Sequence, residues 1–344
     1  MPPIPSSLVR SHLVRSRVFL SLTLAVLTLS VFAAPVKKSL RPEALAGAVI
    51  WQDPGDVGAR DLYYGPGGEK DQPHGPFTFE KEDLDGSNPK FVVRDRDGVK
   101  WKVKLGTEAR PETVASRLVW AVGYFTDEDY FLPDFQVQEM PAHLHRGQAL
   151  VTADGSMRNV RLKRYLKGQE KLGPWSWRGP IGDARGLNGL RVMMALIDNW
   201  DLKDENNSIY EYKGEHPIYV VSDLGASFGT TGNAGPAGKG NLQAYTHAQF
   251  ITRATPEYVD FKTPSRPALT HLLFFNPPAY LRRLRLESIG RHVPLSDARW
   301  VGRMLARLSP DQIAAAFRAA GYGPEDVTAF AAVVETRIAA LNKL

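Results

Sequence analysis

Acidic and amide residues gather where two apolar segments of the chain end. The segment 187–200 carries apolar residues at helical spacing and leads into Asp201–Asn206, Asp-Leu-Lys-Asp-Glu-Asn. A short apolar run at 217–221 has the character of a strand and leads into Asp223–Gly225, Asp-Leu-Gly. Because a buried helix and a buried strand each deliver a carboxylate at their ends, this stretch constrains the fold more than any other.

These residue types suit phosphoryl transfer, which needs positioning and charge neutralisation more than covalent chemistry from the protein. Asp201 is the candidate that accepts the proton of an attacking hydroxyl, and Lys203 is the candidate that faces the transferred phosphoryl group. Asn206 and Asp223 offer the oxygen ligands that the hard cation Mg²⁺ prefers. The stretch therefore predicts a phosphotransferase site for ATP and Mg²⁺.

At these residues the chain resembles the protein-kinase-like superfamily. Asp201–Asn206 is similar to the kinase catalytic loop, and Asp223–Gly225 is similar to the metal-binding step that follows it. Asn199 and Trp200 stand where ordinary kinases have His-Arg, so the resemblance is to the atypical branch, which includes HipA-like, CotH-like and secretory-pathway kinases. It implies an α+β, bilobal protein-kinase-like fold with a strand-rich N-terminal lobe and a helical C-terminal lobe.

The region before the apolar helix is expected to form three antiparallel strands, at 76–80, 90–94 and 99–105. The third strand alternates apolar residues with lysines. The resemblance implies that one of these lysines neutralises the α- and β-phosphates, with Lys104 as the first choice and Lys102 as the alternative. A solvated strand face would explain the same alternation.

The turn after the first strand and the helix after the third complete the predicted nucleotide site. Gly86, Ser87 and Lys90 form a turn similar to the phosphate-contacting loop of HipA-like kinases, although a plain hairpin turn would need no function. Pro111 indicates a helix start and places Glu112 in the first turn. There Glu112 would pair with the strand lysine, as the resemblance implies.

The later part of the chain is expected to be helical. Thr230–Lys239 is rich in glycine and stands where a kinase has its activation segment. Further helices are predicted at 278–289, 296–308, 309–320 and 324–341, the third with a Ser309/Gln312 capping box. The predicted division is a signal peptide (1–33), a linker and N-terminal extension (34–75), an N-lobe (76–166) and a C-lobe (167–344).

The first 33 residues have the pattern of an export signal, with three arginines, an apolar run at 18–32 and small residues before Ala34. A signal anchor is the alternative, but the run is short for a bilayer, so no membrane span is expected after cleavage. Without the three arginines the formal net charge of +6 falls to +3, which weakens the case for a nucleic-acid partner. The chain has no cysteine, which excludes disulfides and thiolate metal sites.

Two functions fit these observations. The first is an exported kinase, periplasmic or extracellular, that moves the γ-phosphoryl of MgATP to a hydroxyl on a protein substrate. The second is a catalytically silent pseudokinase that binds nucleotide or protein in the cell envelope. Trp200 and the single glycine of the phosphate turn favour the second, whereas Asp201, Asn206 and Asp223 together favour a nucleotide-binding site.

Signal cleavage predicts that the exported protein begins at Ala34. Mass measurement of the protein recovered from the exported fraction is expected to give a chain without the arginines and the apolar run. An intact Met1 in the membrane fraction would establish a signal anchor instead.

Overall fold

The computed structural model describes residues 47–86, 88–179, 181–213, 215–229, 238–263 and 277–344. The predicted signal peptide at 1–33, Ser87 and residues 230–237 of the predicted activation segment lie outside the described residues. In the described part of the chain, no helix combines the length and the apolar character needed to cross a membrane.

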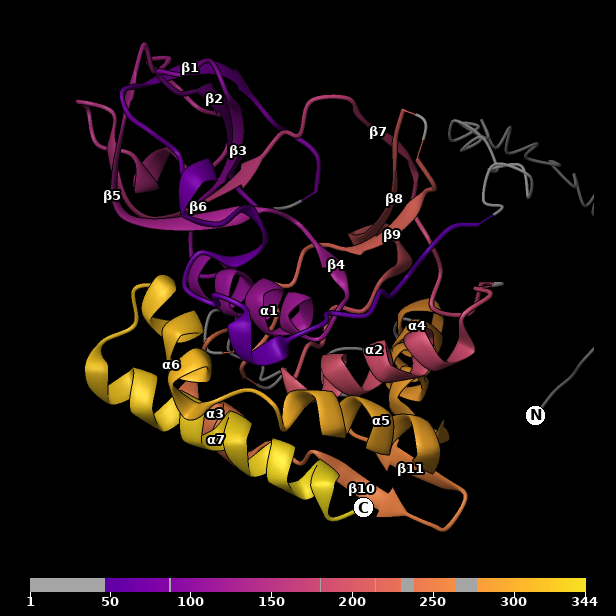
Figure 1. The fold of residues 1–344 in the computed structure, drawn as a ribbon. Coiled ribbons are helices and arrows are strands. Elements are labelled where there is room, and N and C mark those ends of the chain that lie inside the picture. The colour runs from indigo at the N-terminus through magenta and orange to yellow at the C-terminus, as the bar shows by residue number, and fades with distance from the viewer. Residues whose placement is uncertain (1–46, 87, 180, 214, 230–237, 264–276) are drawn as a thin grey trace, which may run out of the picture. The chain divides into compact units, whose positions relative to one another are not determined.

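Strands of the first half close into a small barrel (Figure 1). The strands in barrel order are β1 (Phe77–Glu82), β2 (Lys90–Arg94), β3 (Lys100–Lys104), β6 (Ser156–Arg164) and β5 (Asp129–Gln138). A short parallel pairing of β1 with β5 closes the barrel, and the other neighbouring strands are antiparallel. The alternating residues Trp101 and Val103 fill its interior, so the barrel has an apolar core of its own. The three predicted strands are confirmed to within two residues at each end.

Helix α1 (Ala109–Ala121) packs both on the barrel strands β5 and β6 and on the C-terminal helix α6 (Pro310–Ala319). Because it is enclosed on both sides, almost every residue of α1 is buried, including the polar ones except Arg110. Val114 and Leu118 have no exposed surface, as their predicted place on the apolar face requires. The first turn of α1 is thereby fixed against the end of the barrel.

A second sheet has the order β4-β9-β8-β7. Its strands are β4 (Phe125–Thr126), β9 (Ile218–Val221), β8 (Asn207–Tyr212) and β7 (Gln169–Gly173). The strand predicted at 217–221 is confirmed as β9. Helix α2 spans Ala184–Leu196, so the predicted end at residue 200 was wrong. The helix stops early because Asp198 takes a left-handed backbone, with φ of 54°.

The sequence suggested a linker at 34–75. The described part of this segment, which begins at residue 47, is instead ordered by short helices and buried side chains. Short 3₁₀ helices η2 (Val57–Ala59), η3 (Gly65–Gly67) and η4 (Glu69–Asp71) cross it. Ile50, Val57 and Leu62 are each at most 1% exposed and join the core beneath α1 and α2. The sequence did not reveal this order, because the segment contacts the core through single apolar side chains and shows no repeating apolar pattern.

The C-terminal region contains the four predicted helices, within three residues at each end. The helices are α3 (Leu242–His247), α4 (Pro277–Glu287), α5 (Leu295–Leu305), α6 and α7 (Pro324–Asn342), of which α3 was not predicted. The predicted Ser309/Gln312 capping box is confirmed. The region also contains a sheet that was not predicted, of order β10 (Ile251–Ala254), β11 (Tyr258–Phe261) and β12 (Val293–Pro294).

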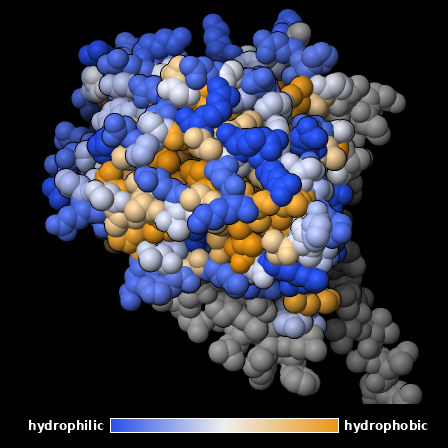
Figure 2. All heavy atoms as spheres, turned by 60° about the horizontal axis from the view of Figure 1, so that its bottom comes forward, coloured by the Kyte–Doolittle hydropathy of each residue, from blue (hydrophilic) through white to orange (hydrophobic). Residues whose placement is uncertain are grey.

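The fold class is therefore α+β, with a strand-rich N-terminal region and a helical C-terminal region, as predicted. Figure 2 turns the lower side of Figure 1 forward and shows apolar patches between hydrophilic residues on that face. The boundaries proposed between N-lobe and C-lobe stay predictions.

One buried cation joins three helices of the C-terminal region. Arg337 of α7 is 4% exposed and donates hydrogen bonds of 3.0 Å to the carbonyls of Ala195 and Leu196, at the end of α2. It also donates to the carbonyls of Tyr245 and Ala248, at the end of α3, at 3.1 Å. The carbonyl ends of helices favour a positive charge, so this contact stabilises the end of α2 that leads into the predicted catalytic loop.

Replacement of Arg337 by leucine is expected to lower the free energy of unfolding by about 3 kcal/mol, because it removes four hydrogen bonds from a buried cation to carbonyl groups at two helix ends. Urea denaturation of the purified protein measures this loss. Arg337→Lys should recover part of it, since an ammonium cannot reach both helix ends in the same geometry. Arg303→Leu, at an exposed position of α5, is the control and should change stability by less than about 0.5 kcal/mol. Equal effects at both positions would contradict the role of Arg337.

Candidate active site

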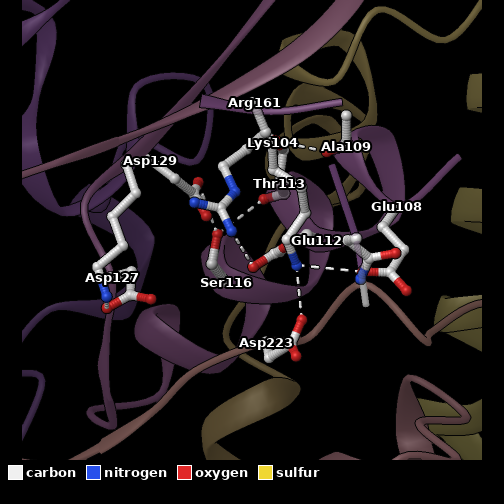
Figure 3. Close-up of polar contacts among 12 residues, drawn as sticks. Lys104, Glu108, Ala109, Glu112, Thr113, Ser116, Asp127, Asp129, Arg161 and Asp223 are labelled. Atoms are coloured by element: carbon white, nitrogen blue, oxygen red, sulfur yellow. Dashed lines mark hydrogen bonds and ion pairs between the residues drawn. The ribbon is translucent and has the colours of Figure 1, made fainter. Parts of the chain in front are cut away.

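Lys104 is the centre of the candidate site (Figure 3). Along its face of β3, Lys100 is exposed, Lys102 is half-buried and Lys104 is buried. Its Nζ lies 2.6 Å from Glu112 Oε2 and 2.6 Å from Asp223 Oδ1. Although burial acts to lower it, the pKa of Lys104 is raised above its ordinary value by the Glu112 and Asp223 carboxylates. The side chain is therefore a cation throughout the physiological pH range.

Glu112 is shared between two cations. Its Oε1 accepts a hydrogen bond from Arg161 of β6, which stands directly opposite Lys104 in the antiparallel ladder of β3 and β6. Like charges in directly opposed positions destabilise a strand pair. The Glu112 carboxylate between them is therefore what allows Lys104 and Arg161 to be buried side by side.

Asp223 comes to this cluster from the turn after β9. Its φ is 54°, a left-handed conformation that an aspartate tolerates better than most residues. Gly225, two residues on, has no room for a side chain, because a Cβ there would lie 2.6 Å from the Cβ of Glu108. Burial acts to raise the pKa of Asp223, but the Lys104 ammonium, with Arg161, holds it at about 2. Asp223 is thus ionised at neutral pH.

The predicted catalytic loop is ordered by its own side chains. The backbone N–H of Asp201 donates to Asn199 Oδ1 at 2.9 Å, and Asn206 Nδ2 donates to the Asp201 carbonyl at 2.6 Å. Lys203 Nζ lies 2.7 Å from Asp201 Oδ1. Asn206 ends the 3₁₀ helix η6 (Asp204–Asn206), which turns the chain into β8. The loop therefore holds Asp201, Lys203 and Asn206 within a few ångströms of one another.

A cleft of about 460 Å³ collects the predicted site residues that the structure describes. They are Gly86, Lys90, Lys104, Glu112, Asp201, Lys203, Asn206 and Asp223. Ser87 lies outside the described residues. Lys102 also lines the cleft, but its Nζ lies 2.7 Å from Asp83 Oδ2, so Lys104 is the better placed of the two candidate lysines. The roles assigned to these residues stay predictions.

Residues that the sequence did not single out also line the cleft: Asn88, Glu108, Arg161 and Lys239. Lys104 Nζ lies 3.1 Å from Glu108 Oε2, and the acidic oxygens of Glu108, Glu112 and Asp223 lie within 4.8 Å of one another around this ammonium. The only sequence signal for Glu108 was its position four residues after Lys104, between the strand and the helix. No local pattern marks Arg161 or Lys239, since their partners are distant in the sequence.

No protein-family model and no curated protein sequence matches the chain. Among solved structures, the chain is similar to the proinflammatory kinase CtkA of Helicobacter pylori, with a TM-score of 0.46 and 10% sequence identity. The similarity covers 77% of this chain and 95% of that chain.

Asp198 is a second unusual acid, three residues before Asp201. It is 1% exposed, and within the described residues neither of its carboxylate oxygens has a hydrogen-bond partner. Burial raises its pKa to about 7, against the opposing influence of Arg337 and Lys262. A raised acid pKa contributes stability that is complete below the unfolded pKa of about 4 and is lost as pH rises through the folded value. Stability should therefore fall between about pH 4 and pH 7.

Asp198→Asn removes this titration, and asparagine tolerates the left-handed backbone at this position. The variant is expected to match wild type near pH 5 and to exceed its free energy of unfolding near pH 8, by on the order of 2 kcal/mol. Urea denaturation at the two pH values measures the difference. Asp134→Asn, whose side chain is 79% exposed, is the matched control and should follow wild type at both. If the free energy of unfolding of wild type and of Asp198→Asn changed equally between the two pH values, Asp198 would not be the buried neutral acid described here.

Proposed function

We propose that the chain is a protein-kinase-like phosphotransferase that moves the γ-phosphoryl of MgATP to a hydroxyl of a protein substrate. The observation that carries this proposal is the meeting of Lys104, Glu112 and Asp223, which come from β3, α1 and the turn after β9. A strand lysine paired with a helix glutamate, next to a metal-binding acid, is the arrangement this chemistry uses. The same cleft is lined by Asp201 and Asn206.

The donor atoms suit Mg²⁺. Asp223 is ionised at neutral pH, because its pKa is held at about 2. The Asn206 amide nitrogen donates to the Asp201 carbonyl, so the amide oxygen points away from that carbonyl and is the atom offered to a cation. Mg²⁺ prefers such oxygen ligands. MgATP would supply the transferable phosphoryl group.

The chain's own residues have distinct tasks in this proposal. Asp201 accepts the proton of the attacking hydroxyl, and Lys203, whose Nζ lies 2.7 Å from Asp201 Oδ1, adds positive charge beside the reacting oxygen. Lys104 neutralises the phosphates, positioned by Glu112. Gly86, with φ of 64°, allows the turn between β1 and β2 to present backbone amides to the phosphates.

A silent nucleotide-binding module is the second candidate. The contacts that favour it are the close pairing of Asp201 with Lys203, at 2.7 and 3.0 Å to its two oxygens, and the engagement of Lys104 by three carboxylates among the described residues. These ion pairs neutralise the charged groups of the site without requiring any catalysis. The export proposed from residues 1–33 would place the protein in the periplasm or outside the cell under either function.

Two isosteric substitutions separate the enzyme from the silent module. Asp223→Asn suits the left-handed backbone and removes the charge on the proposed metal ligand, so it is expected to weaken MgATP binding by about 10-fold or more. Asp201→Asn should leave binding nearly unchanged and lower turnover by about 10³-fold, because the proton acceptor acts on the hydroxyl. Nucleotide titration and phosphorylation or ATP-hydrolysis assays measure the two effects.

Asp134→Asn is the control for both variants and should retain wild-type binding and turnover. Binding without turnover in wild type would favour the silent module. Unfolding of both site variants would mean that these acids serve the fold, and it would contradict the assigned roles.

A further inference from the structure

The Glu108 carboxylate is a meeting point of donors from different elements of the fold. Within the described residues, Glu108 Oε2 accepts from Asn88 Nδ2 at 2.7 Å and from Lys104 Nζ at 3.1 Å, and Oε1 accepts from Lys239 Nζ at 2.5 Å. Glu108 precedes α1 directly, but its side chain does not cap the helix. Its side chain is only 9% exposed, so these contacts are shielded from water.

The donors are held in place by the surrounding structure. Asn88 stands in the turn between β1 and β2, next to the predicted phosphate-contacting residues. Lys239 lies further along the chain than the Asp223–Gly225 step, and its ammonium lies 5.7 Å from the centre of the Trp200 ring. The backbone beside it is fixed, because Trp200 Nε1 donates to the Gly238 carbonyl at 3.0 Å and Gly240 N–H donates to the Ser227 carbonyl at 2.9 Å.

Two ammonium groups and an amide N–H that converge on one anion form the kind of donor set that binds a phosphate group. The position is also suitable, because Glu108 packs directly against Gly225 of the Asp-Leu-Gly step and shares Lys104 with Asp223. The carboxylate satisfies these donors when no other anion is present. It also adds a negative charge where an incoming phosphate must bind, and like charges at short range repel.

We propose that Asn88 and Lys239 are further phosphate-binding residues of this site, and that Glu108 is an internal anion which occupies them until a nucleotide phosphate displaces it. This inference rests on the proposed function and adds a competing contact within the same site. Binding of MgATP therefore requires that Asn88, Lys104 and Lys239 exchange the Glu108 carboxylate for phosphate oxygens. Glu108 lowers the affinity of the site for nucleotide, whereas Lys239 raises it.

Glu108→Gln keeps the size of the side chain and removes the competing charge, so MgATP should bind roughly 10-fold more tightly. Lys239→Gln removes a phosphate donor and should weaken binding by roughly 10-fold. Asn88→Ser, in a half-buried turn, should weaken binding by about 3-fold. This last substitution involves no buried charge, so it tests the proposal even if a charge variant fails to fold.

The controls come from an ion pair of the same barrel that does not line the cleft, Glu80 with Lys100, at 3.0 Å. Glu80→Gln and Lys100→Gln should bind MgATP as wild type does. Calorimetric titration of the folded proteins with MgATP gives all the affinities, and thermal unfolding confirms that each variant is folded.

The outcomes separate the two levels of the proposal. Tighter binding by Glu108→Gln together with weaker binding by Lys239→Gln and Asn88→Ser supports the displaced-anion scheme. Wild type that binds MgATP while all three variants retain its affinity overturns this inference and leaves the proposed function standing. Folded wild type that does not bind MgATP overturns both.

Discussion

The structure depends on one buried ammonium and the carboxylates around it. Lys104 is 3% exposed, and burial of an unpaired charge would cost several kcal/mol. Glu112 and Asp223, each 2.6 Å away, offset that cost, and they belong to α1 and to the turn after β9. The barrel, the helix and the second sheet must therefore come together correctly for Lys104 to be tolerated at all. Correct folding and assembly of the candidate site are the same event.

The charged side chains that stabilise the fold around Lys104 also form the candidate active site. Arg161 stands opposite Lys104 and shares Glu112 with it, while α1 is enclosed by the barrel and by α6. Glu112 is thereby positioned before any ligand arrives, which is the condition for electrostatic preorganisation. Glu108 adds a third carboxylate, and its donors Asn88 and Lys239 extend the cluster to two further segments that line the cleft.

The C-terminal helices stabilise the end of α2, which leads into the loop that carries Asp201. Arg337 joins the end of α2 to the end of α3, and α2 leads into the loop through the buried Asp198. The four hydrogen bonds that Arg337 donates place its positive charge at the carbonyl ends of both helices. The helical region therefore contributes to the candidate site by fixing where α2 ends. Among the described residues, no side chain after Lys239 in the sequence lines the cleft.

The sequence by itself determined the features that depend on local spacing. Alternation in β3 placed Lys104 on one face of a strand, Pro111 placed Glu112 in a first helical turn, and the capping residues of α6 marked its start, because each pattern acts within a few residues. Only the tertiary structure decided that Arg161 stands opposite Lys104 and that Lys239 reaches Glu108, 131 residues away. Such partners follow from strand register, barrel closure and the burial of the segment before β1. These are set by the packing of the whole chain, and no short run of residues encodes them.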